Sequence, residues 1–90
     1  PPHLLRLADG RLLMSYGYRR PPYGVQARMS ADDGRTWSAP ITLSDDGAGS
    51  DLGYPSTVQL QDGHLLTVWY EMPAGKERAG LRLAEWVLQA

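Results

Sequence analysis

The feature that most constrains this chain is an internal repeat. Residues 2–13 align without a gap with residues 55–66, 53 positions later, and the two segments share Pro, Leu, Asp, Gly, Leu and Leu at matching positions. Further along, residues 26–29 resemble residues 80–83 at an interval of 54. A repeat of about 50 residues that holds several short strands has the length of one propeller blade. The repeat therefore predicts one structural unit used twice, side by side.

Each repeat unit carries the signals of short antiparallel strands, and no segment has a convincing helical period. Asp9-Gly10 and Asp62-Gly63 are hairpin signals, because glycine adopts positive φ without strain. Residues 25–30 alternate apolar and polar side chains, as a half-buried strand does. We expect strands at residues 3–7, 11–18, 25–30 and 39–43 in the first unit and 56–60, 64–70 and 79–88 in the second.

The predicted fold class is all-β, with two antiparallel four-stranded β-propeller blades of which the second stops before a clear fourth strand. Residues 1–53 would form the first blade and residues 54–90 the second, together one partial propeller domain. The start at Pro1, without an initiator methionine, is expected of a segment cut from a longer protein. A small sandwich or an open meander is the alternative architecture.

Composition excludes several classes of partner. The formal net charge is −1, which argues against non-specific binding of nucleic acid or of a membrane surface. There is no cysteine and there are two histidines, so we expect no disulfide, no metal site and no cofactor. No apolar run approaches the roughly 18–20 residues of a membrane span.

The order of the strands sorts the loops into two groups, because successive turns of an antiparallel meander lie at alternate ends of the sheet. The turns at 8–10, 31–36 and 61–63 should share one rim, and the loops at 19–24, 44–54 and 71–78 the other. Long loops with charged and aromatic side chains on a rigid scaffold are where sites usually lie. The second rim gathers Arg19, Arg20, Tyr23, Asp45, Asp46, Asp51, Tyr54, Glu71, Lys76, Glu77 and Arg78.

A turn motif lies between the third and fourth expected strands. Residues 30–37 match the Asp-box pattern S-x-D-x-G-x-T-W at every fixed position, namely Ser30, Asp32, Gly34, Thr36 and Trp37. Asp32 can accept backbone N–H bonds inside the turn, and Gly34 supplies a backbone shape that other residues resist. Trp37 is expected to pack between neighbouring sheets. The motif is structural and lies on the rim away from the candidate site.

Over nearly its whole length the chain resembles the C-terminal two blades of the six-bladed sialidase superfamily. The resemblance rests on Arg19-Arg20 before a strand and the Asp-box, then Gly53-Tyr54, and then residues 62–66 and Tyr70-Glu71. It implies a sialidase-like glycoside hydrolase that acts on sialic-acid-type or other acidic glycans. Secretion or a periplasmic location is favoured by the resemblance alone.

The resemblance also implies roles for individual residues. Tyr54 matches the tyrosine nucleophile, and Arg20, or its neighbour Arg19, matches an arginine that grips the sugar carboxylate through a charge-assisted pair. Arg28 is a weaker candidate, because Arg82 suggests a repeated structural position. Further ligand contacts would come from Tyr23, Asp51 and Glu71. Pro55 is expected to favour extended backbone at Tyr54.

The same resemblance leaves the activity open. The general base and acid and the other clamp arginines of sialidases precede this region, so residues 1–90 alone would lack them and are expected to be inactive. A carbohydrate-binding propeller without catalysis is one alternative. Another is a two-blade unit that assembles into a trimeric ring, in place of the remaining blades of a longer protein. The expected partners are therefore a glycan and either further blades or further copies of the chain.

Overall fold

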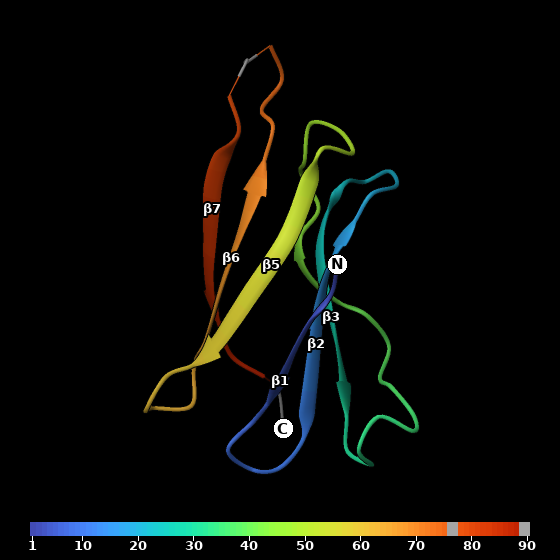
Figure 1. Ribbon diagram of the computed structural model, residues 1–90, viewed down its shortest axis with the longest axis vertical. Helices are drawn as coiled ribbons and strands as arrows, with labels where there is room; N and C mark the ends of the chain where they lie inside the picture. Colours follow the sequence, from blue (N-terminus) through green and yellow to red (C-terminus); the bar gives the residue numbers. More distant parts are fainter. Residues whose placement is uncertain (76–77, 89–90) are drawn as a thin grey trace.

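The computed structural model describes residues 1–75 and 78–88, and in these residues the chain is all-β, as predicted. The strands form a four-stranded antiparallel sheet in the order β1-β2-β3-β4 and a three-stranded antiparallel sheet in the order β5-β6-β7 (Figure 1). The described strands are β1 (His3–Arg6), β2 (Leu12–Tyr18), β3 (Gly24–Ser30), β4 (Ile41–Ser44), β5 (Leu52–Gln59), β6 (Leu65–Glu71) and β7 (Gly80–Trp86).

The internal repeat is confirmed in the register of the first hairpin of each sheet. Arg6 pairs with Leu12 between β1 and β2, and Gln59 pairs with Leu65 between β5 and β6, so both partners recur at the interval seen in the sequence. The two sheets stack face to face, with β5 lying against β1 and β2. The described residues do not close a propeller ring.

The third strands repeat at a longer interval than the sequence suggested. Met14 pairs with Arg28 across β2 and β3, whereas the equivalent Thr67 pairs with Ala84 across β6 and β7. Arg28 therefore corresponds to Ala84, and the expected equivalence of Arg28 with Arg82 is wrong. The cause is the β6–β7 loop, which is longer than the β2–β3 loop.

Strand β5 begins earlier than the sequence indicated. It starts at Leu52 rather than at residue 56, so the expected division after residue 53 falls inside β5. The register of β5 against β6 shifts between Gly53 and Ser56, which marks a β-bulge. The pattern of alternation misses this part of the strand because the bulge interrupts the period of two.

An apolar core fills the space between the two sheets. Leu7, Leu13 and Ala27 of the first sheet are buried against Leu65 of β6. Removal of this apolar area from water is the main stabilising term for the stack, at about 25 cal/mol for each Å² buried. Half-buried residues extend the cluster, namely Leu5, Met29, Leu43, Trp86 and Leu88.

Hydroxyl groups also join the sheets within this core. Ser15 Oγ of β2 lies 3.1 Å from Thr57 Oγ1 of β5, and Thr57 Oγ1 lies 2.9 Å from Thr67 Oγ1 of β6. Trp86 Nε1 donates to Thr67 Oγ1 at 3.0 Å. These buried groups therefore satisfy one another across the stack, as buried polar groups must if they are not to destabilise it.

The loops lie at two ends of the stack, as the order of the strands predicted. Figure 1 shows the β1–β2 and β5–β6 hairpins at the lower end, together with the β3–β4 connection. The β2–β3, β4–β5 and β6–β7 loops reach the upper end. No helix long and apolar enough to cross a membrane is found among the described residues.

The Asp-box forms a closed hydrogen-bonded turn. Asp32 accepts bonds from the backbone N–H of Thr36 at 2.8 Å, from the Thr36 hydroxyl at 2.6 Å and from the Ser30 hydroxyl at 2.8 Å. Gly34 has a φ of 90°, as expected. Trp37 does not join the core between the sheets; its indole N–H donates to Gly34 O at 3.1 Å, and the ring lies over its own turn. Trp69 and Trp86 take the places between the sheets.

We expect the stabilising effect of Asp32 to depend on pH. Hydrogen bonds from Thr36 and Ser30 lower the pKa of Asp32 from 3.8 to about 2. A lowered folded-state pKa gives stability that is present above the unfolded value and lost as the pH falls toward 2. The difference in melting temperature between the wild type and Asp32→Ala should therefore be full at pH 6 and shrink between pH 4 and pH 2. A difference that stays constant over that range would contradict the assignment.

Candidate functional site

Tyr54 occupies the bulge in β5 at the upper rim. Its φ of 50° lies in the left-handed region, which a non-glycine residue rarely adopts, and 58% of its surface is exposed. The extended backbone expected from Pro55 is therefore wrong, because the bulge turns the chain at this residue. Strained, exposed residues of this kind cluster at functional sites.

The backbone near Tyr54 approaches the first sheet closely. A Cβ added to Gly17 of β2 would lie 3.0 Å from Gly53 Cα, so only glycine fits there without a shift. Gly53 itself has a φ of 130°. The two glycines let the end of β2 lie beside the start of β5. This close approach brings Arg19, which directly follows β2, next to Tyr54.

Arg19 is the side chain that this approach delivers. Its Nε donates to the carbonyl of Leu52 at 3.0 Å, and the centre of its guanidinium lies 5.8 Å from the centroid of the Tyr54 ring. A cation at that distance from an aromatic ring is attracted to the ring face. The bond to Leu52 fixes the guanidinium, and among the described residues its terminal amino groups have no hydrogen-bonded partner.

Tyr70 of β6 completes the group. Its ring stacks on Tyr54 with centroids 5.7 Å apart and an interplanar angle of 29°, and its hydroxyl donates to Asp51 Oδ1 at 2.9 Å. That hydrogen bond raises the pKa of Tyr70 above its ordinary value of 10.0, so Tyr70 stays protonated. We call Arg19, Asp51, Tyr54 and Tyr70 the tyrosine site.

Sequence reasoning did not predict Tyr70 as a site residue, although a signal was present. The Asp62-Gly63 turn fixes the pairing of Gln59 with Leu65. Counted outward along the hairpin without a bulge, this register sets Tyr54 opposite Tyr70; in the structure the bulge pairs Gly53 with Tyr70, and the rings of Tyr54 and Tyr70 still stack. Counting the register would therefore have brought Tyr70 to the neighbourhood of Tyr54, although not the bulge between them.

The structure separates the other predicted residues from this group. Arg20 is exposed, one position beyond Arg19. Tyr23 is half-buried and its carbonyl accepts from Gly47 N at 2.8 Å, which ties it to the β4–β5 loop. Arg78 is exposed. Lys76 and Glu77, which the sequence predicted for the same rim, lie outside the described residues.

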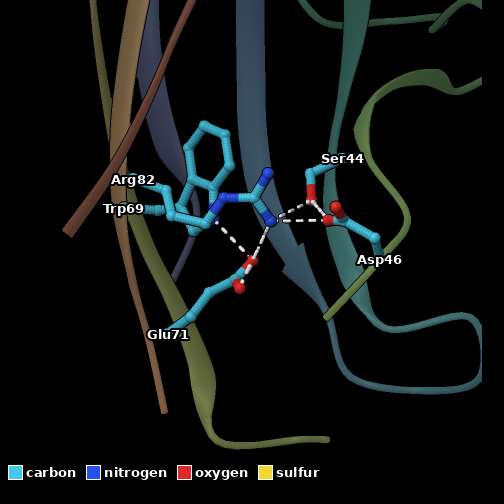
Figure 2. A network of polar contacts seen from close by, with 5 residues as sticks. All are labelled: Ser44, Asp46, Trp69, Glu71 and Arg82. Atoms are coloured by element: carbon cyan, nitrogen blue, oxygen red, sulfur yellow. Dashed lines mark hydrogen bonds and ion pairs between the residues drawn. The ribbon is translucent and has the colours of Figure 1, made fainter. Parts of the chain in front are cut away.

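Glu71 lies on the other face of β6, buried between the sheets. Figure 2 shows its carboxylate beside Arg82 of β7. Glu71 Oε1 accepts from Trp69 Nε1 at 3.0 Å and from Arg82 at 3.2 Å. The guanidinium of Arg82 also lies 5.7 Å from the centroid of the Trp69 ring. Glu71 is thus committed to the interior and does not face Tyr54.

The same arginine reaches the first sheet. Arg82 donates to Asp46 in the β4–β5 loop, and Ser44 at the end of β4 donates to Asp46 at 3.1 Å (Figure 2). The ion pair lowers the pKa of Asp46 and raises that of Arg82. We call Ser44, Asp46, Trp69, Glu71 and Arg82 the intersheet network. It fastens the two sheets together beneath the rim that carries the tyrosine site.

The chemistry open to the tyrosine site is recognition of an anion beside an aromatic surface. Arg19 offers a fixed cation, and Tyr54 offers an exposed ring and a hydroxyl with no hydrogen-bonded partner in the described part of the chain. Asp51 is occupied by Tyr70. Over residues 1–75 and 78–88, no three His, Cys, Asp or Glu side chains are grouped to hold a metal ion.

Of the comparisons with known proteins, the one with solved structures gives a match. No family model matches the chain, and no curated protein does. The chain is similar to a solved crystal structure of a protein of unknown function from Dyadobacter fermentans DSM 18053, with 38% identity and a TM-score of 0.78. The similarity covers 98% of this chain and 25% of that one, so the chain spans about a quarter of the length of the matched structure.

Proposed function

We propose that this chain is part of a sialidase-like glycoside hydrolase that acts on sialic-acid-type or other acidic glycans, and that it binds the glycan at the tyrosine site. The observation that carries the proposal is the fixed guanidinium of Arg19 beside the exposed, strained Tyr54. A sialoside presents a carboxylate next to its anomeric carbon. Arg19 would bind that carboxylate, and the phenol of Tyr54 would lie at the reacting carbon.

Arg19 suits the clamp better than Arg20 does. Its Nε bond to Leu52 holds the guanidinium in one plane before any ligand arrives. A pre-organised fork loses less entropy when it pairs with a carboxylate. Both arginines are exposed, but among the described residues no such bond holds the guanidinium of Arg20. The proposal therefore assigns the carboxylate to Arg19 and leaves Arg20 at the periphery.

A neutral phenol needs a neighbouring base to act as a nucleophile. The carboxylate nearest Tyr54 in the tyrosine site, that of Asp51, is bonded to Tyr70, and that of Glu71 is bonded to Trp69 and Arg82. Neither bond reaches the hydroxyl of Tyr54, and in the proposal the base comes from another part of the longer protein, as the resemblance implies. We therefore expect the 90-residue chain to bind the sugar and not to hydrolyse it.

The proposal predicts that binding depends on the ligand's carboxylate. Titration of the 90-residue chain with N-acetylneuraminic acid, followed by NMR, should shift the signals of Arg19 and Tyr54. The methyl ester of the same sugar should bind at least about tenfold more weakly, because one charge-assisted hydrogen bond contributes about 1.5–3 kcal/mol. Arg19→Gln should remove the preference for the acid, and Arg20→Gln, the matched control, should keep it.

Equal affinity for the acid and the ester, or an equal loss in both arginine variants, would contradict the assignment of the clamp. The nucleophile is tested separately. In a longer chain that hydrolyses a chromogenic sialoside, Tyr54→Phe should abolish turnover while the affinity for N-acetylneuraminic acid is kept. Unchanged turnover in Tyr54→Phe would remove Tyr54 from the mechanism.

Recognition without hydrolysis is the second candidate function. It is favoured by the hydroxyl of Tyr54, because among the described residues no carboxylate is hydrogen-bonded to it: Asp51 is bonded to Tyr70, and Glu71 to Trp69 and Arg82. A glycan array that shows binding of acidic glycans, together with a longer chain that does not release the sugar, would support this candidate over the first.

A further inference from the structure

The outer face of the second sheet is apolar and exposed. Leu81 and Leu83 of β7 are 79% and 64% exposed, and Val58 of β5 is 50% exposed. The pairings of β6 place Leu66 opposite Val58 and Val68 opposite Leu83 on the same face. Contiguous apolar surface of this kind marks an interaction site.

The repeat shows what this face corresponds to. Through the matched pairings, Leu81 and Leu83 are equivalent to Val25 and Ala27 of β3. Those two residues are 0% exposed, because they lie on the face of the first sheet that packs against the second. The outer face of the second sheet is thus the equivalent of a face that is already covered in the structure.

The outer face of the first sheet corresponds in the same way to a buried face of the second sheet. Leu4, which is 58% exposed, corresponds to Thr57, and Met14 corresponds to Thr67. Both threonines are buried on the face of the second sheet that packs against the first. A hollow of about 350 Å³ lies on this outer face, lined by Pro2, Met14, Tyr16, Tyr18, Gln26 and Arg28.

We propose that the outer face of β5–β7 docks the outer face of β1–β4 of a second copy of the 90-residue chain, by repeating the stacking that already joins the two sheets within one copy; in the longer protein of the proposed function, further sheets of the same chain would occupy these faces instead. A second copy as the occupant follows from the interface within one copy. The outer face of β5–β7 is equivalent to the inner face of the first sheet, and the outer face of β1–β4 is equivalent to the inner face of the second sheet. Those two inner faces already pack against each other. The contact is head to tail, so successive copies form a ring or an extended stack.

Two exposed substitutions test the two faces separately. In sedimentation velocity at high micromolar concentration, the wild-type chain should exceed the mass of a single chain. Leu83→Lys on one face and Leu4→Lys on the other should each give the mass of one chain. Each variant should need at least about tenfold higher concentration than the wild type to associate, because burying a lysine in an apolar contact is costly. Ala48→Lys, in the exposed β4–β5 loop, adds the same charge and should leave association unchanged.

Mixing the two variants distinguishes head-to-tail stacking from other contacts. Leu4→Lys keeps an intact β5–β7 face and Leu83→Lys keeps an intact β1–β4 face, so an equimolar mixture should form a complex of two chains that neither variant forms alone. Self-association of Leu4→Lys alone would show that like faces pair and would overturn the proposal. A wild-type chain of single mass at high micromolar concentration would also overturn it. Unchanged melting temperatures of the dilute variants confirm that both are folded.

Discussion

Truncation of Leu65 to alanine should destabilise the chain by about 2–5 kcal/mol, the cost of removing a large side chain from a packed core. Leu65 is 0% exposed and contacts residues of both sheets in the apolar cluster with Leu7, Leu13 and Ala27. The cavity left by Leu65→Ala would lie at the contact between the sheets, where neither sheet can collapse into it alone. Urea unfolding of the dilute chain measures the effect.

A leucine outside the core serves as the control, because it separates the effect of burial from the effect of removing the same atoms. Leu81→Ala removes the same atoms from a side chain that is 79% exposed, so its effect on the free energy of unfolding should stay within about 0.5 kcal/mol. Similar losses in both variants would mean that the core does not lie between the sheets. A loss in Leu65→Ala near the total stability of the chain would abolish the cooperative transition, which near-ultraviolet circular dichroism would detect.

Replacement of Arg82 by methionine should cost about 2–4 kcal/mol, because it leaves the buried carboxylate of Glu71 without its cation. Glu71 would keep only the indole N–H of Trp69, and Asp46 would lose its bond across the sheets. Adding Glu71→Gln to this variant should recover part of the loss, since the amide oxygen still accepts from Trp69 and carries no charge. Chemical unfolding of the single and double variants gives the coupling.

An exposed ion pair supplies the control for this experiment. Arg6 lies 3.1 Å from Asp33, and both side chains are exposed, so Arg6→Met should change the stability by at most about 1 kcal/mol. If Arg82→Met were no more costly than Arg6→Met, Glu71 would be hydrated without its partner, and the intersheet network would not be a stabilising contact.

The fold was predictable from the sequence where local rules decide it. The Asp-Gly turns fix both hairpin registers, and the repeated segments adopt the same pairing. The sorting of the loops to two rims followed from strand order alone, and the absence of helix in the described residues followed from the lack of a helical period. Each of these depends on neighbours in sequence or on the antiparallel order, which a single sequence displays.

The predictions failed where distant residues decide the outcome. The bulge at Tyr54 lies where the start of β5 approaches β2, and Pro55 did not keep Tyr54 extended. Glu71 was predicted at the rim with its neighbours, but its partner Arg82 belongs to another strand and holds it inside. Arg19 could be distinguished from Arg20 only once Leu52 was in place to bind it. None of these contacts leaves a local pattern in the sequence.

The hydrogen-bonded contacts from Ser15 through Thr57 and Thr67 to Trp86 limit how far one sheet can shift along the other. Aliphatic surfaces tolerate small translations at little cost, whereas a hydrogen bond weakens steeply when its geometry is lost. Two sheets joined by leucines alone could slide past each other by a fraction of a residue. With directional bonds in the seam, such a slip would leave buried hydroxyls unpaired. Arg19 from one sheet and Tyr54 from the other are thereby kept in a constant relative position.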